Sequence, residues 1–244
     1  MNGKYYESEY EEAFCDLLRE QGWIIEHGDD LHRKYTDALL EEDLMLFLKE
    51  QYSSAGLTDT DYNNIVSRLR NISGATNYTS HREAYKLYHD GLDVSFSDQT
   101  KPSVHIDYID YGKHDDGSKS HNIFRAVNQF EMHEGKENRR PDIMLLINGI
   151  PVGIIELKNP TDQNATIRDA HTQICLRYRR DIFSLLRYCA VACISDGSNS
   201  RLGTVFTPYE YFYAWKKIKN EDKPGQGVNQ MKSLIAGALS PDRI

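Results

Sequence analysis

The 244-residue sequence contains only four cysteines, and their spacing excludes two kinds of covalent or metal framework. Cys15, Cys175, Cys189 and Cys193 form no CxxC pair and have no zinc-ligand spacing. A disulfide-stapled domain and a structural zinc site are therefore not expected. We expect reduced, mostly buried thiols in a cytoplasmic protein.

Long apolar runs, targeting segments and nucleotide-binding loops are also missing. No apolar run approaches the roughly 20 residues that span a bilayer. The first residues, MNGKYYESEYEE, are polar and acidic, unlike a secretory signal. No GxxxxGK[ST] phosphate loop occurs, and GSKS at 117–120 does not have its spacing. We therefore expect a protein without membrane contact, and a chain that does not itself hydrolyse ATP through such a loop.

The sequence has no overall excess of positive charge, since its formal net charge is −8. This balance argues against a broad surface that binds nucleic acid non-specifically, but it allows a local basic groove. Basic residues do gather on both sides of the stretch 140–160, at Lys136, Arg139, Arg140, Arg177, Arg179, Arg180 and Arg187.

Periodicity predicts an α/β fold in which helices flank a mixed sheet. The pattern predicts helices over 7–21, 37–52, 59–71, 80–89, 166–182, 209–219 and 228–244. It predicts strands over 23–28, 103–110, 126–133, 143–147, 152–158, 188–195 and 201–208. Thr58 or Thr60 is a candidate start for the helix over 59–71. Thr166 is a candidate start for the helix over 166–182, and it stands three residues before Asp169, as in a capping box.

The stretch RPDIMLLINGIPVGIIELKNP, residues 140–160, places charges inside apolar strands. Glu156 and Lys158 are two apart on a strand, so their side chains leave the same face, whereas Ile155 and Leu157 leave the other. Burying a charge without a partner is unfavourable. One face of this strand is therefore expected to line a polar cavity.

The position of Asp142 depends on the turn at Asn148-Gly149. A strict two-residue turn would pair 142 with 155 and direct Asp142 to the wrong face. A three-residue loop with a bulge pairs 142 with 156, and Pro151, which lacks an amide proton, suits an irregular turn. Opposed residues of an antiparallel pair share a face. We therefore predict a bulged loop and an Asp142 carboxylate beside that of Glu156.

Two adjacent carboxylates and a lysine suit a divalent metal. One carboxylate would take up a proton unless a cation intervened, and Mg²⁺ favours carboxylates together with waters and phosphate oxygens. Such a set can hydrolyse a phosphodiester, with Lys158 orienting water or stabilising charge on phosphorus. From spacing alone, a buried ion pair and a degenerate site in a binding module remain alternatives.

The chain is similar to a known family over the stretch VNQFEMHEGKENRRPDIMLLINGIPVGIIELKNP and through RYRRDIFSLLRYCAVACISDGSNSRLGT. It resembles the N-terminal nuclease domain of the restriction (R) subunit of type I restriction–modification enzymes. The resemblance implies a restriction-endonuclease-like PD-(D/E)xK fold and cleavage of foreign double-stranded DNA. It also implies coupling to ATP-driven translocation in the full-length subunit, and assembly with modification and specificity subunits.

The resemblance implies roles for particular residues. Asp142, Glu156 and the backbone carbonyl of Leu157 would hold Mg²⁺, with Mn²⁺ as a substitute, and Lys158 would serve the attacking water. A carboxylate from the first helix, Glu9 or Glu12, is a candidate for the same site, although either can be an exposed helix glutamate.

The helix after Lys158 departs from the family pattern. The family often carries a glutamine four residues before a tyrosine, whereas Gln173 precedes Tyr178 by five. Five residues place the two side chains about 140° apart on an ideal α-helix. Gln173, Arg177 and Arg180 would instead share a face, which we expect to point to the site and to DNA, as we expect of Arg139 and Arg140.

The predicted organisation has a nuclease domain over residues 1–218, with 28–100 as a helical insertion or cover. Residues 219–244 are expected to be a linker leading to ATPase motor domains that this chain lacks. The alternative from another functional class is a non-catalytic DNA-binding or subunit-docking module that keeps a degenerate nuclease site. A junction resolvase or repair nuclease of the same fold is a further alternative.

Overall fold

The computed structural model describes residues 3–95, 102–112, 120–159, 166–219, 221–226 and 228–244. The chain divides into two compact units. Unit 1 contains residues 1–38, 124–146 and 151–244, and unit 2 contains 39–123 and 147–150. The second unit thus begins and ends later in the chain than the insertion expected over 28–100. The tract GSKS lies outside the described residues except for Ser120.

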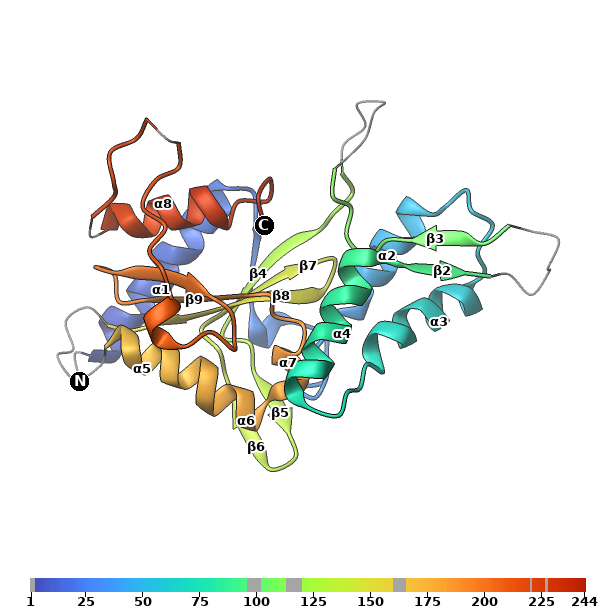
Figure 1. The fold of residues 1–244 in the computed structure, drawn as a ribbon, viewed down its shortest axis with the longest axis horizontal. Coiled ribbons are helices and arrows are strands. Elements are labelled where there is room, and N and C mark those ends of the chain that lie inside the picture. The colour runs from blue at the N-terminus through green and yellow to red at the C-terminus, as the bar shows by residue number, and fades with distance from the viewer. Residues whose placement is uncertain (1–2, 96–101, 113–119, 160–165, 220, 227) are drawn as a thin grey trace. The chain divides into compact units, whose positions relative to one another are not determined.

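Unit 1 is built on a mixed sheet of six strands in the order β1-β4-β7-β8-β9-β10 (Figure 1). β1 runs parallel to β4, and β8 parallel to β9, whereas β10 is antiparallel to β9. Their bounds are Ile24–His27 (β1), Phe124–Asn128 (β4), Ile143–Ile147 (β7), Ile150–Leu157 (β8), Val191–Ser195 (β9) and Ser200–Gly203 (β10). The predicted mixed α/β architecture is confirmed.

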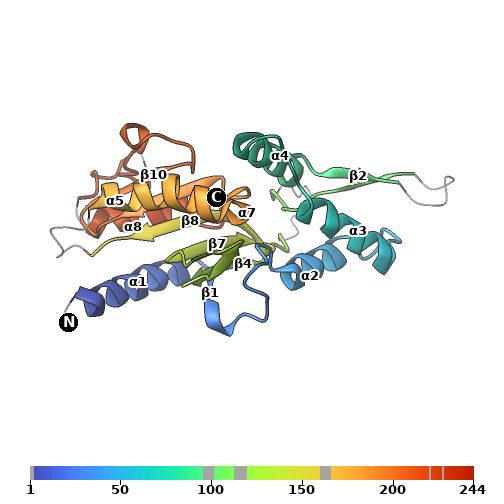
Figure 2. The same cartoon turned by 90° about the horizontal axis from the view of Figure 1, so that it is seen from below.

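Every residue of β7 and β8 is buried, which explains why both strands read as continuous apolar runs rather than as alternating ones. α1 (Gly3–Glu20) lies on one side of the strands and α5 (Ile167–Thr172) on the other (Figure 2). The two layers therefore enclose the sheet, and a polar side chain in β8 needs a partner inside the protein.

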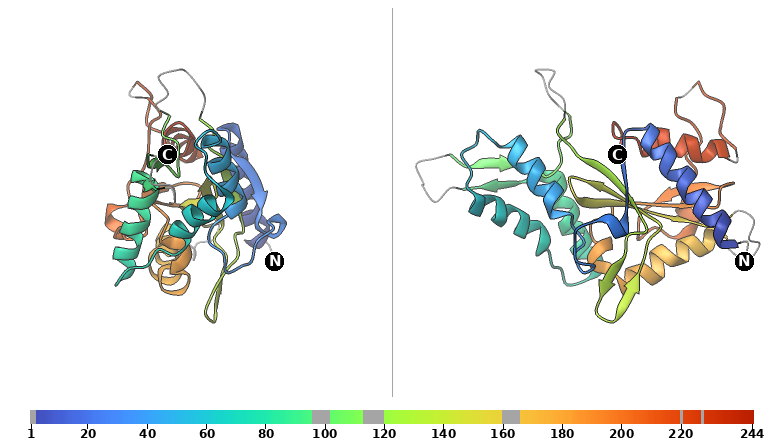
Figure 3. Two further views of the ribbon diagram at one scale, coloured as in Figure 1. Left: turned by 90° about the vertical axis from the view of Figure 1, so that its right-hand side faces the viewer. Right: turned by 180° about the vertical axis from the view of Figure 1, so that it is seen from behind.

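Shorter elements complete unit 1. The hairpin of β5 (Met132–Glu134) and β6 (Glu137–Arg139) extends beyond the sheet (Figure 3). After α5 come η2 (Gln173–Tyr178), α6 (Arg179–Asp181) and α7 (Phe183–Leu186). The remaining elements are the 3₁₀ turns η1 (Gly28–Asp30) and η3 (Tyr209–Tyr211), and α8 (Val228–Ala238). Trp23 Nε1 donates a hydrogen bond to Leu239 O, 2.8 Å away, so the C-terminal segment packs within this unit.

Unit 2 contains α2 (Glu41–Gln51), α3 (Asp59–Arg70), α4 (Asn77–Asp90) and a hairpin of β2 (Leu92–Val94) and β3 (Val104–Ile106). The predicted cap at Thr58 is confirmed. The Thr58 hydroxyl accepts a hydrogen bond from the backbone N–H of Asp61, and the Asp61 carboxylate accepts one from the backbone N–H of Thr58. Tyr108 is fully buried, and its hydroxyl donates to Ile65 O at 2.8 Å. This unit therefore has its own apolar core.

The turn between β7 and β8 is shorter than predicted. β7 ends at Ile147 and β8 begins at Ile150, and both intervening residues have positive φ, 51° at Asn148 and 75° at Gly149. Two central residues with positive φ define the tight turn that Asn-Gly favours. The expected three-residue bulged loop is therefore wrong.

The helix predicted over 209–219 is also wrong. Only the 3₁₀ turn Tyr209–Tyr211 forms there, and Tyr213 instead pairs with Leu202 as an isolated antiparallel bridge. Aromatic residues fit extended backbone well, and the edge of β10 offers them hydrogen-bond partners. Phe212 is buried, but Tyr211 and Tyr213 are exposed, so this aromatic run is only partly core.

All four cysteines are free and buried, as predicted. Burial raises the pKa of Cys15 and of Cys175 to about 12. Because the thiolate is the reactive form, these thiols are poor nucleophiles at neutral pH. Among the described residues, no helix is long and apolar enough to cross a membrane.

Gly149 has no room for a side chain. A Cβ atom there would lie 2.0 Å from Leu40 O, in addition to the strain of a positive φ. We predict that Gly149→Ala lowers the free energy of unfolding by more than about 2 kcal/mol, measured by denaturant titration. Gly135→Ala is the matched control, because Gly135 has a φ of 61° with no atom within 4 Å of its added Cβ. An equal loss in both variants would contradict the steric explanation.

Candidate active site

Asp142 and Glu156 come together at the end of the sheet, although the turn has no bulge. Asp142 stands in a bend just before β7, and its Oδ2 accepts a hydrogen bond from Leu157 N at 2.7 Å. Lys158 N donates to Ser195 O, toward β9. Because alternate amides of a strand point to opposite sides, the Leu157 amide points away from β9, where Asp142 meets it. The bend thus replaces the predicted register shift in directing Asp142 to Glu156.

Glu156 is an almost completely buried carboxylate with one unsatisfied oxygen. Its side chain is 1% exposed, and Oε1 accepts a hydrogen bond from Lys158 Nζ at 3.0 Å. Oε2 is buried without a hydrogen-bond partner. Desolvation, followed by the negative charge of Asp142, raises the pKa of Glu156 well above its usual value, and Lys158 opposes the shift. The site therefore lacks positive charge for its carboxylates.

Lys158 is held in position by a chain of hydrogen bonds. Its Nζ donates to Gln173 Oε1 at 3.0 Å as well as to Glu156, and the side chain is only 12% exposed. Gln173 Nε2 in turn donates to the Tyr178 hydroxyl at 2.6 Å. Since an ammonium group only donates, the amide oxygen must face Lys158 and the amide nitrogen must face Tyr178.

The contact between Gln173 and Tyr178 depends on a π-helix, η2, that the sequence did not reveal. The Arg179 amide hydrogen-bonds to Ile174 O, five residues earlier. The wider π turn brings residues five apart to one side, and such segments often occur at functional sites. The assumption of an ideal α-helix was therefore wrong, and the extra residue between glutamine and tyrosine is absorbed by the wider turn.

The structure does not bring Gln173, Arg177 and Arg180 together as a common face. Gln173 turns to Lys158, whereas Arg180 is 72% exposed and its Nε lies 2.5 Å from Asp181 Oδ1. Arg177 is exposed. Arg139 also donates to Asp181, at 2.8 Å. Asp181 is thus shared by two of the four arginines expected to contact DNA.

A cleft of about 970 Å³ opens beside Asp142, and its walls are α1, β1 and the segment around Gln129. Glu12 and Arg140 line it, whereas Glu9 is exposed and is not among its lining residues. Glu11 also lines the cleft and accepts a hydrogen bond from Gln129 Nε2 at 2.6 Å. The sequence prediction thus included Glu12 but missed Glu11 and Gln129.

The spacing along α1 contained the missing signal. Ser8, Glu11, Glu12, Cys15, Asp16 and Arg19 line the cleft at separations of three and four residues, so they form one helix face. Tyr10 anchors this helix from another side, with its hydroxyl 2.6 Å from Ser195 Oγ. The end of β9 therefore contacts both α1 and, through the amide of Lys158, the strand that carries the site.

The donor set fits a hard divalent cation. Glu156 Oε2 is a buried oxygen without a partner, and the neighbouring Asp142 carboxylate raises the local negative charge. Among the described residues, no group of three or more histidine, cysteine, aspartate or glutamate side chains is arranged to hold a metal ion. A metal here would thus rely on the two carboxylates together with backbone, water or substrate oxygens.

Comparison with known proteins identifies the family. Residues 4–211 match the family described as type I restriction enzyme R protein N terminus. Because this match covers most of the chain, the protein belongs to that family, as the sequence resemblance predicted. Its relatives are named as type I restriction enzyme endonuclease subunits.

Three relatives illustrate the similarity. The HindI endonuclease subunit of Haemophilus influenzae is 25% identical over 97% of this chain and 23% of its own length. The putative MjaIXP endonuclease subunit of Methanocaldococcus jannaschii is 26% identical over 87% of the chain and 20% of its own length. The EcoprrI endonuclease subunit of Escherichia coli is 34% identical over 48% of the chain and 42% of its own length. The chain thus spans about a fifth to a quarter of the length of the first two.

The charge on Asp142 is predicted to control the protonation of Glu156 in the metal-free chain. Asp142→Asn removes a neighbouring negative charge and should lower the pKa of Glu156, as followed by carboxyl ¹³C NMR. A carboxyl whose pKa is raised by folding destabilises the fold as pH rises from the usual value to the raised one. The variant should therefore lose less unfolding free energy over that interval than the unchanged chain.

Asp196→Asn serves as the control, because Asp196 accepts hydrogen bonds from its own turn at Ser198 and Asn199. The pKa of Glu156 should stay unchanged in this variant. A Glu156 pKa that does not move in Asp142→Asn would contradict the coupling of the two carboxylates.

Proposed function

We propose that this chain is a PD-(D/E)xK endonuclease domain that hydrolyses phosphodiester bonds of double-stranded DNA with Mg²⁺. The observation that carries the proposal is the buried Glu156 Oε2, which has no hydrogen-bond partner and lies in a site with a second carboxylate. A protein would gain stability by pairing or protonating such a group, so retaining it is understandable where a cation binds.

The metal ligands in this proposal are Asp142, Glu156 and the carbonyl oxygen of Leu157. The N–H and C=O of one strand residue point to the same side, and the Leu157 N–H points to Asp142. Its carbonyl therefore points to that side too. When bound, Mg²⁺ or Mn²⁺ supplies a Lewis acid that offsets negative charge on the phosphate.

The other residues of the site hold the reacting groups in position. Lys158, fixed by Glu156 and Gln173, holds its ammonium where it can orient the attacking water and stabilise charge on the phosphate. Tyr178 is buried and keeps Gln173 oriented. Its burial, and next the charge of Glu156, raise the pKa of its hydroxyl, so the group stays neutral and does not compete for the metal.

The remaining parts of the proposal concern the whole subunit. In it, cleavage is coupled to ATP-driven translocation by motor domains beyond this chain, and the subunit works with modification and specificity subunits. The names of the relatives as endonuclease subunits support DNA as the substrate. The rival, a docking module with a degenerate site, has no use for a fixed lysine beside a buried carboxylate oxygen that lacks a hydrogen-bond partner.

Metal binding tests the site directly. We predict that Mn²⁺ titration of the 244-residue chain, followed by electron paramagnetic resonance, shows one or two bound ions. Glu156→Gln and Asp142→Asn should each weaken binding by at least about tenfold, because a charged ligand is lost. Glu9→Gln, on the exposed side of α1, is the control and should bind normally. Equal binding in all four proteins would contradict the proposed metal site.

A cleavage assay distinguishes the nuclease from the docking module. In the assembled restriction complex, Lys158→Ala should reduce double-strand cleavage by at least about 100-fold while ATP hydrolysis changes little. The same loss with Lys158→Arg would show that charge alone is insufficient. Full cleavage by Lys158→Ala would instead favour the docking module.

A further inference from the structure

Residues 166–219 form a basic segment in an acidic chain. They contain nine lysines and arginines but four aspartates and glutamates, whereas the whole chain has a net charge of −8. The structure describes all of these residues, and they lie within unit 1. Positive charge is therefore concentrated on the elements from α5 to η3 and on the stretch that follows them, rather than spread over the protein.

Most carboxylates of this segment are used inside it. Asp181 is shared by Arg139 and Arg180, Asp169 accepts hydrogen bonds from Thr166, and Asp196 closes its own turn. The remaining acid, Glu210, lies 4.0 Å from Arg168, with both side chains about two-thirds exposed. So exposed and long an ion pair contributes little energy, and the segment keeps its basic character.

Two arginines meet at a single tyrosine. The guanidinium carbons of Arg168 and Arg201 lie 5.0 Å and 5.3 Å from the centroid of the Tyr209 ring. Because both cations lie beside the same ring, an anion bound there would be attracted by two positive charges. Stacking on a ring also orients the planar guanidinium, whose edge carries the N–H groups that match a phosphate.

The loop that carries Tyr209 is fastened to the helix that also serves the active site. His171 Nε2 donates to Thr207 O at 2.9 Å, Cys175 Sγ to Thr204 O at 3.8 Å, and Arg179 Nη1 to Val205 O at 3.4 Å. Gln173, on another face of the same helix, contacts Lys158. A ligand bound at Tyr209 is therefore positioned relative to Lys158 by one hydrogen-bonded helix.

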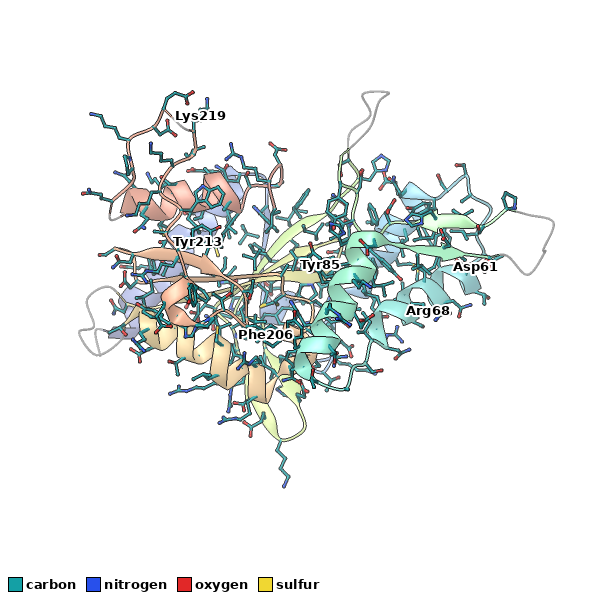
Figure 4. All side chains as sticks on the ribbon, viewed as in Figure 1. Asp61, Arg68, Tyr85, Phe206, Tyr213 and Lys219 are labelled. Atoms are coloured by element: carbon teal, nitrogen blue, oxygen red, sulfur yellow. The ribbon has the colours of Figure 1, made fainter. Side chains whose placement is uncertain are left out.

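Exposed aromatic side chains extend the surface. Tyr211 is 74% exposed, and Tyr213, labelled in Figure 4 with Phe206 and Lys219, is 53% exposed. Such tyrosines lack the burial that would explain them as core, and tyrosine hydroxyls are common donors to DNA phosphates. We use the term Tyr209 surface for Arg168, Arg201, Tyr209 and Tyr211.

We propose that the Tyr209 surface binds the phosphate backbone of duplex DNA outside the catalytic cleft, and that it holds the duplex in position for cleavage. The proposal rests on the proposed nuclease function and adds contacts to those at the site. Phosphate contacts fix register and orientation without reading sequence. The surface is thus expected to bind DNA of any sequence, because its positive charges complement the regularly spaced phosphates of the backbone.

Salt-dependent binding provides the test. Binding of the 244-residue chain to a fluorescent 30-base-pair duplex is measured in EDTA over a range of NaCl concentrations. The slope of log K against log salt is negative, and each lost phosphate contact reduces its magnitude by about 0.9. The double variant Arg168→Gln, Arg201→Gln should therefore reduce this magnitude by about 2 and weaken binding by at least about tenfold at low salt.

Two matched variants test whether the effect comes from charge at these two positions. One removes the same net charge elsewhere, and the other keeps the charge but changes the packing on the ring. Arg82→Gln with Lys86→Gln removes the same charge from exposed positions on α4 of unit 2, and the slope should not change. Arg168→Lys with Arg201→Lys keeps the charge and should keep the slope, even if the ring contacts weaken. Circular dichroism melting checks that each variant folds.

The outcomes are distinguishable. An unchanged slope in the Arg→Gln pair, or an equal fall in the α4 pair, would overturn the Tyr209 surface. Failure of the unchanged chain to bind duplex DNA would overturn it as well. Mn²⁺ uptake at Asp142 and Glu156 is measured on the same proteins. If no metal binds but the magnitude of the slope falls as predicted, the proposed nuclease function is contradicted and DNA binding by the Tyr209 surface is supported.

Discussion

The structure of this site depends on a carboxylate that is buried without enough positive charge to balance it. Glu156 shares one oxygen with Lys158 and keeps the other without a hydrogen-bond partner. Buried, unpaired charge is costly, so every neighbouring element serves to limit or exploit that cost. The bend at Asp142, the fixed lysine and the cleft beside them follow from this constraint.

The lysine is as constrained as the carboxylate. Gln173 holds it from the helix after β8, and Tyr178 holds Gln173 across the π segment of that helix. A π turn is less stable than an α turn, and it persists where the surrounding contacts compensate. Here the compensation is a chain of hydrogen bonds between Lys158 and Tyr178, so the local irregularity and the site geometry support each other.

Sequence reasoning succeeded where periodicity and chemistry agreed. The segments 143–147 and 152–158 were predicted as strands and correspond to β7 and β8, Thr58 begins a helix, and the family resemblance is confirmed. It failed where the backbone departs from an ideal element. The turn is tight rather than bulged, and the aromatic run after Pro208 follows the edge of β10 instead of forming a helix. The tight turn is the one that Asn-Gly itself favours, whereas the pairing of Tyr213 with Leu202, distant in sequence, decided the conformation of the aromatic run.

Alternation along a strand is a local property, so the sequence alone determined that Glu156 and Lys158 share one face and that Ile155 and Leu157 share the other. The approach of Asp142, the part of Glu11 in the cleft and the contact of Gln173 with Tyr178 were decided by the tertiary structure. They depend on a bend, on the packing of α1 and on a π turn. Such departures from ideal geometry are set by what each segment packs against, which no local pattern encodes.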